Sequence, residues 1–295
     1  MSRFNKITLV TVTDDHYAIL LSTLIKSIEA NLSPDYCIDF WVVNDGVSET
    51  KRTKIERSIN TQITSIHWKT PAEIIPKGTR LPLDYSTYPI NIYMRLFIQY
   101  FIPETVSKVL FMDVDMINCT DLKELWELDL DGHIAAAVQD IRVKTFDNHW
   151  GGILNYEDLG FAGDTKYFNS GLLLMDMEKW RHNNISEKAL LCIKNHKKYS
   201  FYPDQYGLNV ELANKWKMID PDWNHFASKR FHHPHQIHFI GRKPIYKSYN
   251  NHSAYRKIFD KYLSQTDFKD AKSISETTRY LKKIKNTVFK FRRIF

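Results

Sequence analysis

Short runs of apolar, β-branched residues alternate with runs whose apolar residues recur at helical spacing. The apolar runs cover residues 7–12 (ITLVTV), 37–43 (CIDFWVV) and 63–68, and such runs are typical of buried strands. Apolar residues recur at the spacing of a helix over residues 17–31 and 48–59. Because strands that alternate with helices at short spacing are joined by right-handed crossovers, the pattern predicts an α/β fold with a mostly parallel sheet.

The same alternation continues to about residue 200. We expect further strands and helices, in chain order, at residues 91–101 (helix), 106–112 (strand), 121–128 (helix), 134–138 (strand), 167–175 (strand) and 177–196 (helix). Residues 71–89 contain four prolines and predict a loop. Residues 202–247 have an irregular pattern rich in aromatic residues and histidine, which also predicts loops. No internal repeat occurs, and no linker precedes about residue 265.

The net charge of the chain comes from its C-terminal end. The whole chain has 41 Lys and Arg against 34 Asp and Glu, a net +7, and residues 268–295 hold nine of these cations and two of the anions. Residues 1–267 therefore carry 32 of each sign. Within this tail an apolar stripe repeats at intervals of three and four, formed by Leu281, Ile284, Val288, Phe291 and Phe295. A basic amphipathic helix of this kind is typical of a membrane-surface anchor on anionic lipid.

Two other interpretations of the tail remain open. The stripe can pack on the protein itself as a terminal helix, or the cations can bind nucleic acid. We do not expect a nucleic-acid partner, because no basic patch with interleaved aromatic residues extends into residues 1–267.

Cysteine usage and hydropathy indicate a soluble protein of the cytosol. Cys37, Cys119 and Cys192 are odd in number and widely spaced, so they predict neither a disulfide framework nor a zinc site. The apolar run at 7–12 is too short for the core of a signal peptide. Nothing approaches the roughly 18–20 uninterrupted apolar residues of a membrane span. We expect a cytoplasmic protein held at the inner face of the plasma membrane by its tail.

The first candidate for chemistry is the pair Asp113-x-Asp115, which directly follows a predicted buried strand. In open α/β sheets, ligands bind at the carboxyl ends of the strands. Two carboxylates at this spacing suit Mg²⁺ or Mn²⁺, which keep coordination sites for diphosphate oxygens. An aspartate that closes a strand is also a common turn former, so the pair alone leaves both interpretations open.

Several segments taken in order resemble the family 8 retaining glycosyltransferases, the group of glycogenin and the bacterial lipooligosaccharide galactosyl- and glucosyltransferases. The resemblance covers about residues 7–247. It rests on segments 13–17 (TDDHY), 93–96 (YMRL), 110–115 (LFMDVD), 167–171 (YFNSG), 204–209 (DQYGLN) and 238–244 (HFIGRKP). It implies a single Rossmann-like nucleotide-sugar-binding domain of the glycosyltransferase A type over residues 1–265. Residues 266–295 then form the basic amphipathic helical tail.

The resemblance also implies which residues bind the nucleotide. Asp14 would accept hydrogen bonds from the uracil or ribose, and Tyr17 would stack on the base. Arg95 would bind a carboxylate, a phosphate or sugar hydroxyls. The alternatives are a core aromatic in the first helical turn for Tyr17 and a snorkelling surface side chain for Arg95.

The metal set is completed at the far end of the domain. The resemblance makes His238 the third ligand beside Asp113 and Asp115, with Mn²⁺ or Mg²⁺ as the cofactor. Lys243 would meet the departing diphosphate, and Gly241 would let the backbone approach it. This segment departs from the family pattern, because one residue instead of two separates Gly241 from the lysine and isoleucine replaces the usual tryptophan after the proline. Arg242 can therefore share the role of Lys243.

The same segment contains His232, His233 and His235. They lack the helical or hairpin spacing of a zinc site. We expect them in loops that face water or the acceptor.

By resemblance, Asp140, Asn169, Asp204 and Gln205 form the sugar side of the site. Gln205 would lie opposite the leaving group, where an amide is a poor nucleophile. The mechanism is then front-face attack within a short-lived ion pair, with Gln205 stabilising positive charge on the ring, or a covalent intermediate on Asp204. We favour the first route.

The sequence leads to a retaining hexosyltransferase that moves glucose or galactose from a UDP-sugar to a glycan or glycolipid acceptor in cell-envelope polysaccharide or lipopolysaccharide synthesis. Two alternatives remain open. One is an enzyme of the same fold that acts on a protein or a soluble glucan. The other is a non-catalytic protein that binds nucleotide sugars.

Overall fold

The structure, a computed structural model, describes residues 4–83 and 88–294. Contacts divide the chain into two units, each made of separate segments. Unit 1 comprises Met1–Pro71, Met112–Leu128 and Asp222–Lys285, and unit 2 comprises Ala72–Phe111, Asp129–Pro221 and Asn286–Phe295. The fold is α/β with a mostly parallel central sheet, as predicted.

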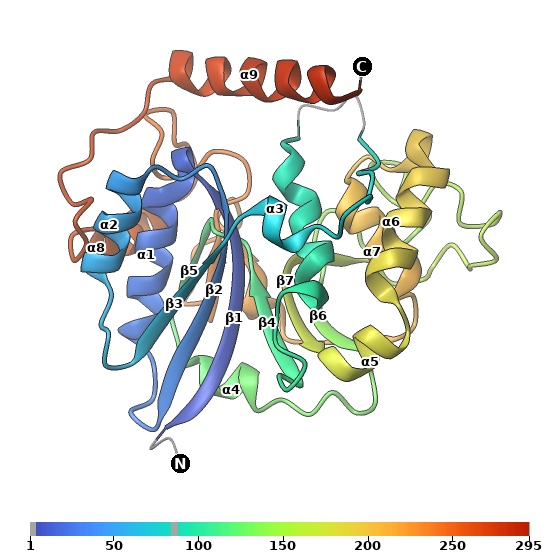
Figure 1. Cartoon of the computed structure of the whole chain (residues 1–295), viewed down its shortest axis with the longest axis horizontal. Coiled ribbons are helices and arrows are strands. Elements are labelled where there is room, and N and C mark those ends of the chain that lie inside the picture. Colours follow the sequence, from blue (N-terminus) through green and yellow to red (C-terminus); the bar gives the residue numbers. More distant parts are fainter. Residues whose placement is uncertain (1–3, 84–87, 295) are drawn as a thin grey trace. The chain divides into compact units, whose positions relative to one another are not determined.

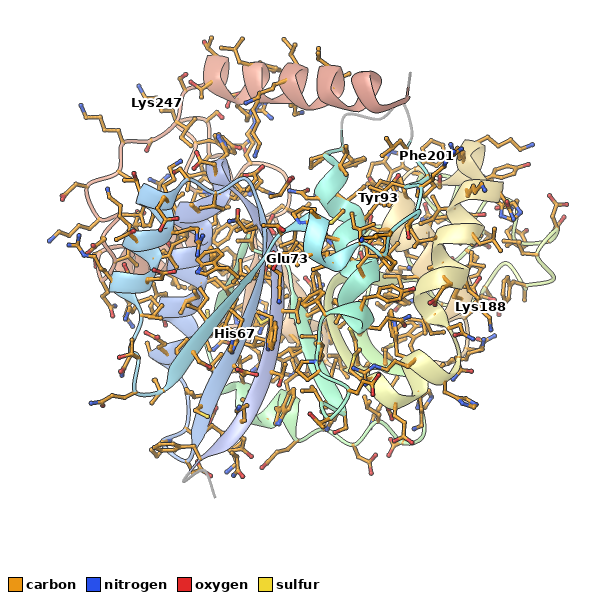
Figure 2. All side chains as sticks on the ribbon, viewed as in Figure 1. His67, Glu73, Tyr93, Lys188, Phe201 and Lys247 are labelled. Atoms are coloured by element: carbon orange, nitrogen blue, oxygen red, sulfur yellow. The ribbon has the colours of Figure 1, made fainter. Side chains whose placement is uncertain are left out.

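Unit 1 begins with the strands predicted from the first apolar runs. β1 (Asn5–Asp14), β2 (Tyr36–Asp45) and β3 (Thr64–Lys69) pair in parallel in the order β3-β2-β1. The helices α1 (Ala18–Glu29) and α2 (Glu49–Ser58) connect them and lie alongside (Figure 1). On β3, the ring of His67, labelled in Figure 2, stacks on Trp41 with centroids 4.4 Å apart. Asp14 and Asp45 both end up at the carboxyl edge of this parallel pair, since they are partners in its register.

A second, smaller sheet in unit 1 follows Asp113-Val114-Asp115. β5 (Met116–Asn118) pairs antiparallel with β10 (Gln236–His238), which pairs in parallel with β9 (His225–Phe226). The short helices α4 (Leu122–Trp126) and η4 (Pro221–Asn224) adjoin these strands, and α8 (Ser253–Leu263) packs on α1. This sheet therefore places β5, which directly follows Asp115, beside a strand more than a hundred residues later in the chain.

Unit 2 holds the strands in the order β4-β7-β6-β8. These are β4 (Lys108–Met112), β7 (Phe168–Asp176), β6 (Ala135–Gln139) and β8 (Trp216–Met218). β6 runs antiparallel to β7 and parallel to β8, so the sheet is mixed here. The helices are η2 (Ile90–Tyr100), α5 (Met177–His182), α6 (Ile185–Asn195) and α7 (Pro203–Glu211), with short helices at α3 (Pro71–Ile74) and η3 (Lys197–Tyr199).

The helices of unit 2 are closely packed. Tyr93 of η2, labelled in Figure 2, is fully buried and donates its hydroxyl to the carbonyl of Pro82. A Cβ at Gly207 of α7 would lie 2.7 Å from the carbonyl oxygen of Ala189 in α6. The close approach of these two helices therefore requires glycine at this position.

Three predictions of secondary structure were wrong, at least in part. The helix expected over 177–196 is two helices, because Asn184 adopts a left-handed conformation with φ 53°. The region expected to be loops, 202–247, contains α7 and the strands β8, β9 and β10. Every residue from Pro203 to Val210 is buried, so α7 has no exposed face and its polar residues, Asp204, Gln205 and Asn209, do not mark a solvent side. The loop predicted over 71–89 begins with the short helix α3, and residues 84–87 of it lie outside the described residues.

The tail forms the helix α9 (Glu276–Ile294) (Figure 1). Among the helices of the described residues, α9 included, none combines the length and the apolar character that crossing a membrane requires. The predicted boundary near residue 265 stays a prediction.

Candidate functional site

Three side chains that can bind a divalent cation converge in unit 1. Nε2 of His238 lies 3.2 Å from Oδ1 of Asp115 and 3.7 Å from Oδ2 of Asp113. The three ligand atoms, one from each residue, all lie within 4.8 Å of one another. The β5–β10 ladder explains this convergence, because His238 pairs with Met116, the residue after Asp115. The fold thus brings together the three residues predicted as metal ligands.

The orientation of the His238 ring is fixed by Asn224, a residue to which the sequence analysis gave no role. Nδ1 of His238 lies 2.8 Å from Oδ1 of Asn224, and both side chains are buried. Since an amide oxygen accepts, Nδ1 carries the proton and donates it, and Nε2 is left to face the two carboxylates. A second hydrogen-bonded residue of this kind is the usual support of a metal-binding histidine.

Lys243 also reaches the aspartates. Its Nζ forms an ion pair with Oδ2 of Asp115 and donates to the carbonyl of Phe239 at 3.0 Å. Burial by itself would raise the pKa of the Asp115 carboxyl, but the adjacent Lys243 and His238 outweigh it and hold that pKa well below its ordinary value. Asp115 is therefore ionised, and its charge is balanced by Lys243 and His238. Gly241, two residues before the lysine, has φ +84°, a conformation that favours glycine.

The donor set fits a hard divalent cation. Two carboxylates and one imidazole supply oxygen-rich ligation suited to Mg²⁺ or Mn²⁺. The set lacks the thiolates and multiple imidazoles of a structural zinc site.

The predicted nucleotide residues Asp14 and Tyr17 also lie in unit 1, at the end of β1. Oδ1 of Asp14 accepts from the backbone N–H of Tyr17 at 3.0 Å and thereby caps the short helix η1 (Asp15–Tyr17). The hydroxyl of Tyr246 lies 3.3 Å from that of Tyr17 and 2.9 Å from Nε2 of His16. Burial raises the pKa of the Tyr17 hydroxyl above its ordinary value, so this phenol stays neutral.

Unit 2 holds the remaining candidates, beginning with an ion pair. Nε of Arg95 lies 3.0 Å from Oδ2 of Asp204, with side chains 10% and 9% exposed. The contact is ionic rather than an aligned hydrogen bond. Arg95 also donates to the carbonyl of Ser170 at 2.6 Å, and its guanidinium lies 4.5 Å from the ring centroid of Phe111. The alternative of a snorkelling surface Arg95 is thus wrong.

Gln205 is held by both ends of its amide. Its Oε1 accepts from the backbone N–H of Ser170 at 2.9 Å, and its Nε2 donates to the hydroxyl of Tyr167 at 3.2 Å. Asn209, one helical turn later, exchanges hydrogen bonds with both backbone groups of Phe168. These contacts tie α7 to β7 and fix the position of the Gln205 side chain.

Asp140 and Asn169 contact each other. Nδ2 of Asn169 donates to Oδ2 of Asp140 at 3.0 Å, and Oδ1 of Asp140 accepts from the backbone N–H groups of Arg142 and Val143 at 2.7 and 3.0 Å. Both side chains are buried. Unit 2 therefore brings the candidates together as two pairs, Arg95 with Asp204 as an ion pair and Asn169 with Asp140 through a hydrogen bond.

Sequence reasoning gave no role to several residues that hold this machinery. Ser170, Tyr167 and Asn209 lie in segments that carry the family resemblance, and this was the only indication of them in the sequence. Asn224 had none, because its partner is fixed by strand pairing rather than by spacing. Lys282 of α9, which lies beside Asp14 and Tyr17, was seen only as one cation of the tail.

A second group of possible metal ligands among the described residues is Asp222, His225 and His232. Nε2 of His232 lies 2.7 Å from Oδ1 of Asp222, and Nε2 of His225 lies 2.9 Å from the hydroxyl of Tyr255. These hydrogen bonds within the protein are sufficient to explain why the three side chains lie close together. His232 therefore pairs with a carboxylate instead of simply facing water or the acceptor.

Comparisons with known proteins identify the family and the fold of the chain. The sequence model of glycosyl transferase family 8 matches residues 8–278. General stress protein A of Bacillus subtilis (strain 168) is 26% identical over 286 residues, 88% of this chain and 93% of that protein. Lipopolysaccharide 1,2-glucosyltransferase of Escherichia coli (strain K12) is 30% identical over 132 residues, 45% of this chain and 37% of that protein.

A solved structure has the same fold. The galactosyltransferase LgtC in complex with donor and acceptor sugar analogs matches with a TM-score of 0.71 at 24% identity, covering 88% of this chain and 96% of that one. With the family's sequence pattern over nearly the whole chain and this fold, the protein belongs to glycosyl transferase family 8.

Proposed function

We propose that this glycosyltransferase moves a hexose, glucose or galactose, from a UDP-sugar to a glycan or glycolipid acceptor, with retention at the anomeric carbon. We place the reaction in cell-envelope polysaccharide or lipopolysaccharide synthesis. The observation that carries the proposal is the convergence of Asp113, Asp115 and His238 beside Lys243. The similarity to a lipopolysaccharide glucosyltransferase and to a galactosyltransferase structure supports the substrate class.

In this proposal Asp113, Asp115 and His238 would hold Mn²⁺ or Mg²⁺, and such an ion would supply positive charge for the diphosphate of the donor. Asn224 keeps Nε2 of His238 directed at that position. Lys243 leaves Asp115 and contacts the diphosphate, where its ammonium stabilises the negative charge that develops on the diphosphate as its bond to the sugar breaks. Asp14 and Tyr17 bind the ribose and the base.

Asp140, Asn169 and Gln205 bind the sugar. The amide of Gln205 is fixed by Ser170 and Tyr167, so its orientation is set before the sugar binds. Asp204 is ion-paired with Arg95, which makes it a weaker nucleophile, and this supports front-face attack over a covalent intermediate. Isolation of a glycosyl adduct on Asp204 would contradict that preference.

The test is release of UDP from UDP-glucose and UDP-galactose in the presence of Mn²⁺. We expect activity from the wild type and a loss of at least about 100-fold in Asp113→Asn and Asp115→Asn, in line with losses on removing one charge-stabilising group. Binding of UDP without any turnover, with or without acceptor, would favour the non-catalytic alternative.

We further propose that α9 attaches the protein to the inner face of the plasma membrane. Leu281 and Ile284 are 61% and 60% exposed, so the apolar stripe does not pack on the protein over these turns. This exposure beside many cations supports an anionic lipid partner. Flotation with vesicles containing anionic lipid should retain the full chain and lose a chain without residues 272–295. Equal retention of the two chains would refute the anchor, and retention of neither would favour a soluble glucan or protein acceptor.

A further inference from the structure

The first turns of α9 contact the two residues assigned to the nucleotide. Nζ of Lys282 lies 2.7 Å from Oδ2 of Asp14 and 3.8 Å from the centroid of the Tyr17 ring. The side chains of Lys282 and Asp14 are 18% and 15% exposed. The ammonium therefore covers one face of the Tyr17 ring and pairs with the carboxylate beside it.

The beginning of α9 is attached firmly next to this site. Ile274 exchanges backbone hydrogen bonds with residues 245 and 247, its N–H donating to the carbonyl of Ile245 at 2.8 Å. The hydroxyl of Ser248 donates to Glu276, and the guanidinium of Arg279 lies 5.9 Å from the ring centroid of Tyr246. These contacts hold the start of the helix in place, so Lys282 stays close to Asp14.

The contact of the helix with Asp14 and Tyr17 is nevertheless weak. The side that meets them is polar, whereas Leu281 and Ile284 are exposed. Lys282 makes a single ion pair there, with Asp14. Because Leu281 and Ile284 bury little apolar area, the free energy that opposes release comes mainly from the Lys282 ion pair and its contact with the Tyr17 ring.

We propose that α9 is an autoinhibitory cover of the donor site, in which docked Lys282 and the base of the nucleotide exclude each other. A base stacked on the covered face of Tyr17 needs the space of the ammonium. A ribose or uracil bound by Asp14 needs the oxygen that Lys282 occupies. This inference rests on the proposed function, since it takes Asp14 and Tyr17 as nucleotide ligands. It gives the tail a role at the active site that a simple anchor lacks.

The test is calorimetric titration of the full chain with UDP in the presence of Mn²⁺. Lys282→Ala and Lys282→Glu remove the docking contact, so we expect UDP affinity to increase by about 3- to 10-fold. This is the increase expected if only about a tenth to a third of wild-type chains have the helix released. Lys285→Ala, an exposed lysine one turn later on the same helix, is the matched control and should stay within about twofold. Weaker binding by Lys282→Ala would show that this lysine instead binds the donor, and unchanged binding would equally overturn the proposal.

A second measurement needs no variant. Addition of UDP and Mn²⁺ to the wild type should speed amide hydrogen exchange in residues 279–285, because the released helix loses its contacts. Slower exchange in this segment would contradict displacement. If no form of the chain binds UDP, the proposed donor itself is wrong, an outcome that differs from equal binding by all forms.

Discussion

Lys243 makes opposite contributions to metal binding and to donor binding, and this can be tested by replacing it with methionine. In the structure its ammonium is paired with Asp115, and the two side chains are 13% and 11% exposed. A metal ion at Asp115 must displace this contact and also experiences the repulsion of the ammonium. The Lys243→Met change keeps the aliphatic stem and removes both obstacles.

The magnitude follows from the type of contact that is lost. Hydrogen bonds to charged groups contribute about 1.5–3 kcal/mol, and each 1.4 kcal/mol is tenfold in affinity. We expect Mn²⁺ to bind Lys243→Met about tenfold more tightly in the absence of donor. UDP should bind the Mn²⁺-loaded variant about tenfold more weakly, because the diphosphate loses its cation.

The assay is a titration that follows free Mn²⁺ by electron paramagnetic resonance, followed by calorimetry with UDP. Lys247→Met, which removes an exposed lysine four residues away, is the control and should leave both affinities unchanged (Figure 2). Thermal unfolding gives an independent readout. Without metal the variant should melt at a lower temperature, since buried Asp115 has lost its partner, and Mn²⁺ should restore the difference. Weaker Mn²⁺ binding by Lys243→Met would refute the reasoning.

Further predictions concern stability, metal affinity and the tail. Asn224→Ala should weaken Mn²⁺ binding by about 10- to 100-fold, because the histidine ligand loses its orienting hydrogen bond; an unchanged titration would contradict this role. Arg95→Met should lower the free energy of unfolding by about 3 kcal/mol in urea titrations, since Asp204 is left buried without its guanidinium partner, and Asp204→Asn in the same chain should recover part of the loss. Burial, with Lys282 nearby, lowers the pKa of His16 to about 4, so the fold favours the neutral ring and stability decreases as pH falls from about 6.5 to about 4. Over that interval the wild type should lose about 2 kcal/mol more than His16→Asn, allowing for solvent screening, and parallel pH curves would refute it. Vesicles of anionic lipid should tighten UDP binding by the wild type and leave Lys282→Glu unaffected; an equal gain in both would exclude release of the helix as the cause.

The sequence predicted those parts of the fold whose burial leaves a periodic pattern. β1 and β2 are continuous apolar runs in the sequence because both faces of these strands are covered. The aspartates after β4 were found because a polar pair directly follows such a run. The convergence of His238 on them came from the family resemblance, since β10 has three residues and carries no periodicity of its own.

The parts that escaped prediction are set by tertiary contacts. α7 is buried on all sides from Pro203 to Val210, so no alternation of polar and apolar positions marks it. The break before α6 depends on one left-handed residue, Asn184. The tail pattern predicted a helix with an apolar stripe. It did not indicate that Lys282 on the polar side would meet Asp14, because that contact depends on how residues 274–276 attach to the chain.

The central claim is that the cluster Asp113, Asp115 and His238 serves transfer from a UDP-sugar, and UDP release tests it most directly. Purified full chain is incubated with UDP-glucose or UDP-galactose and Mn²⁺, and UDP is measured with and without a chelator. We predict release with at least one donor, abolished by the chelator and by Asp115→Asn. Release that persists in Asp115→Asn, or no release with any UDP-sugar, would contradict the account.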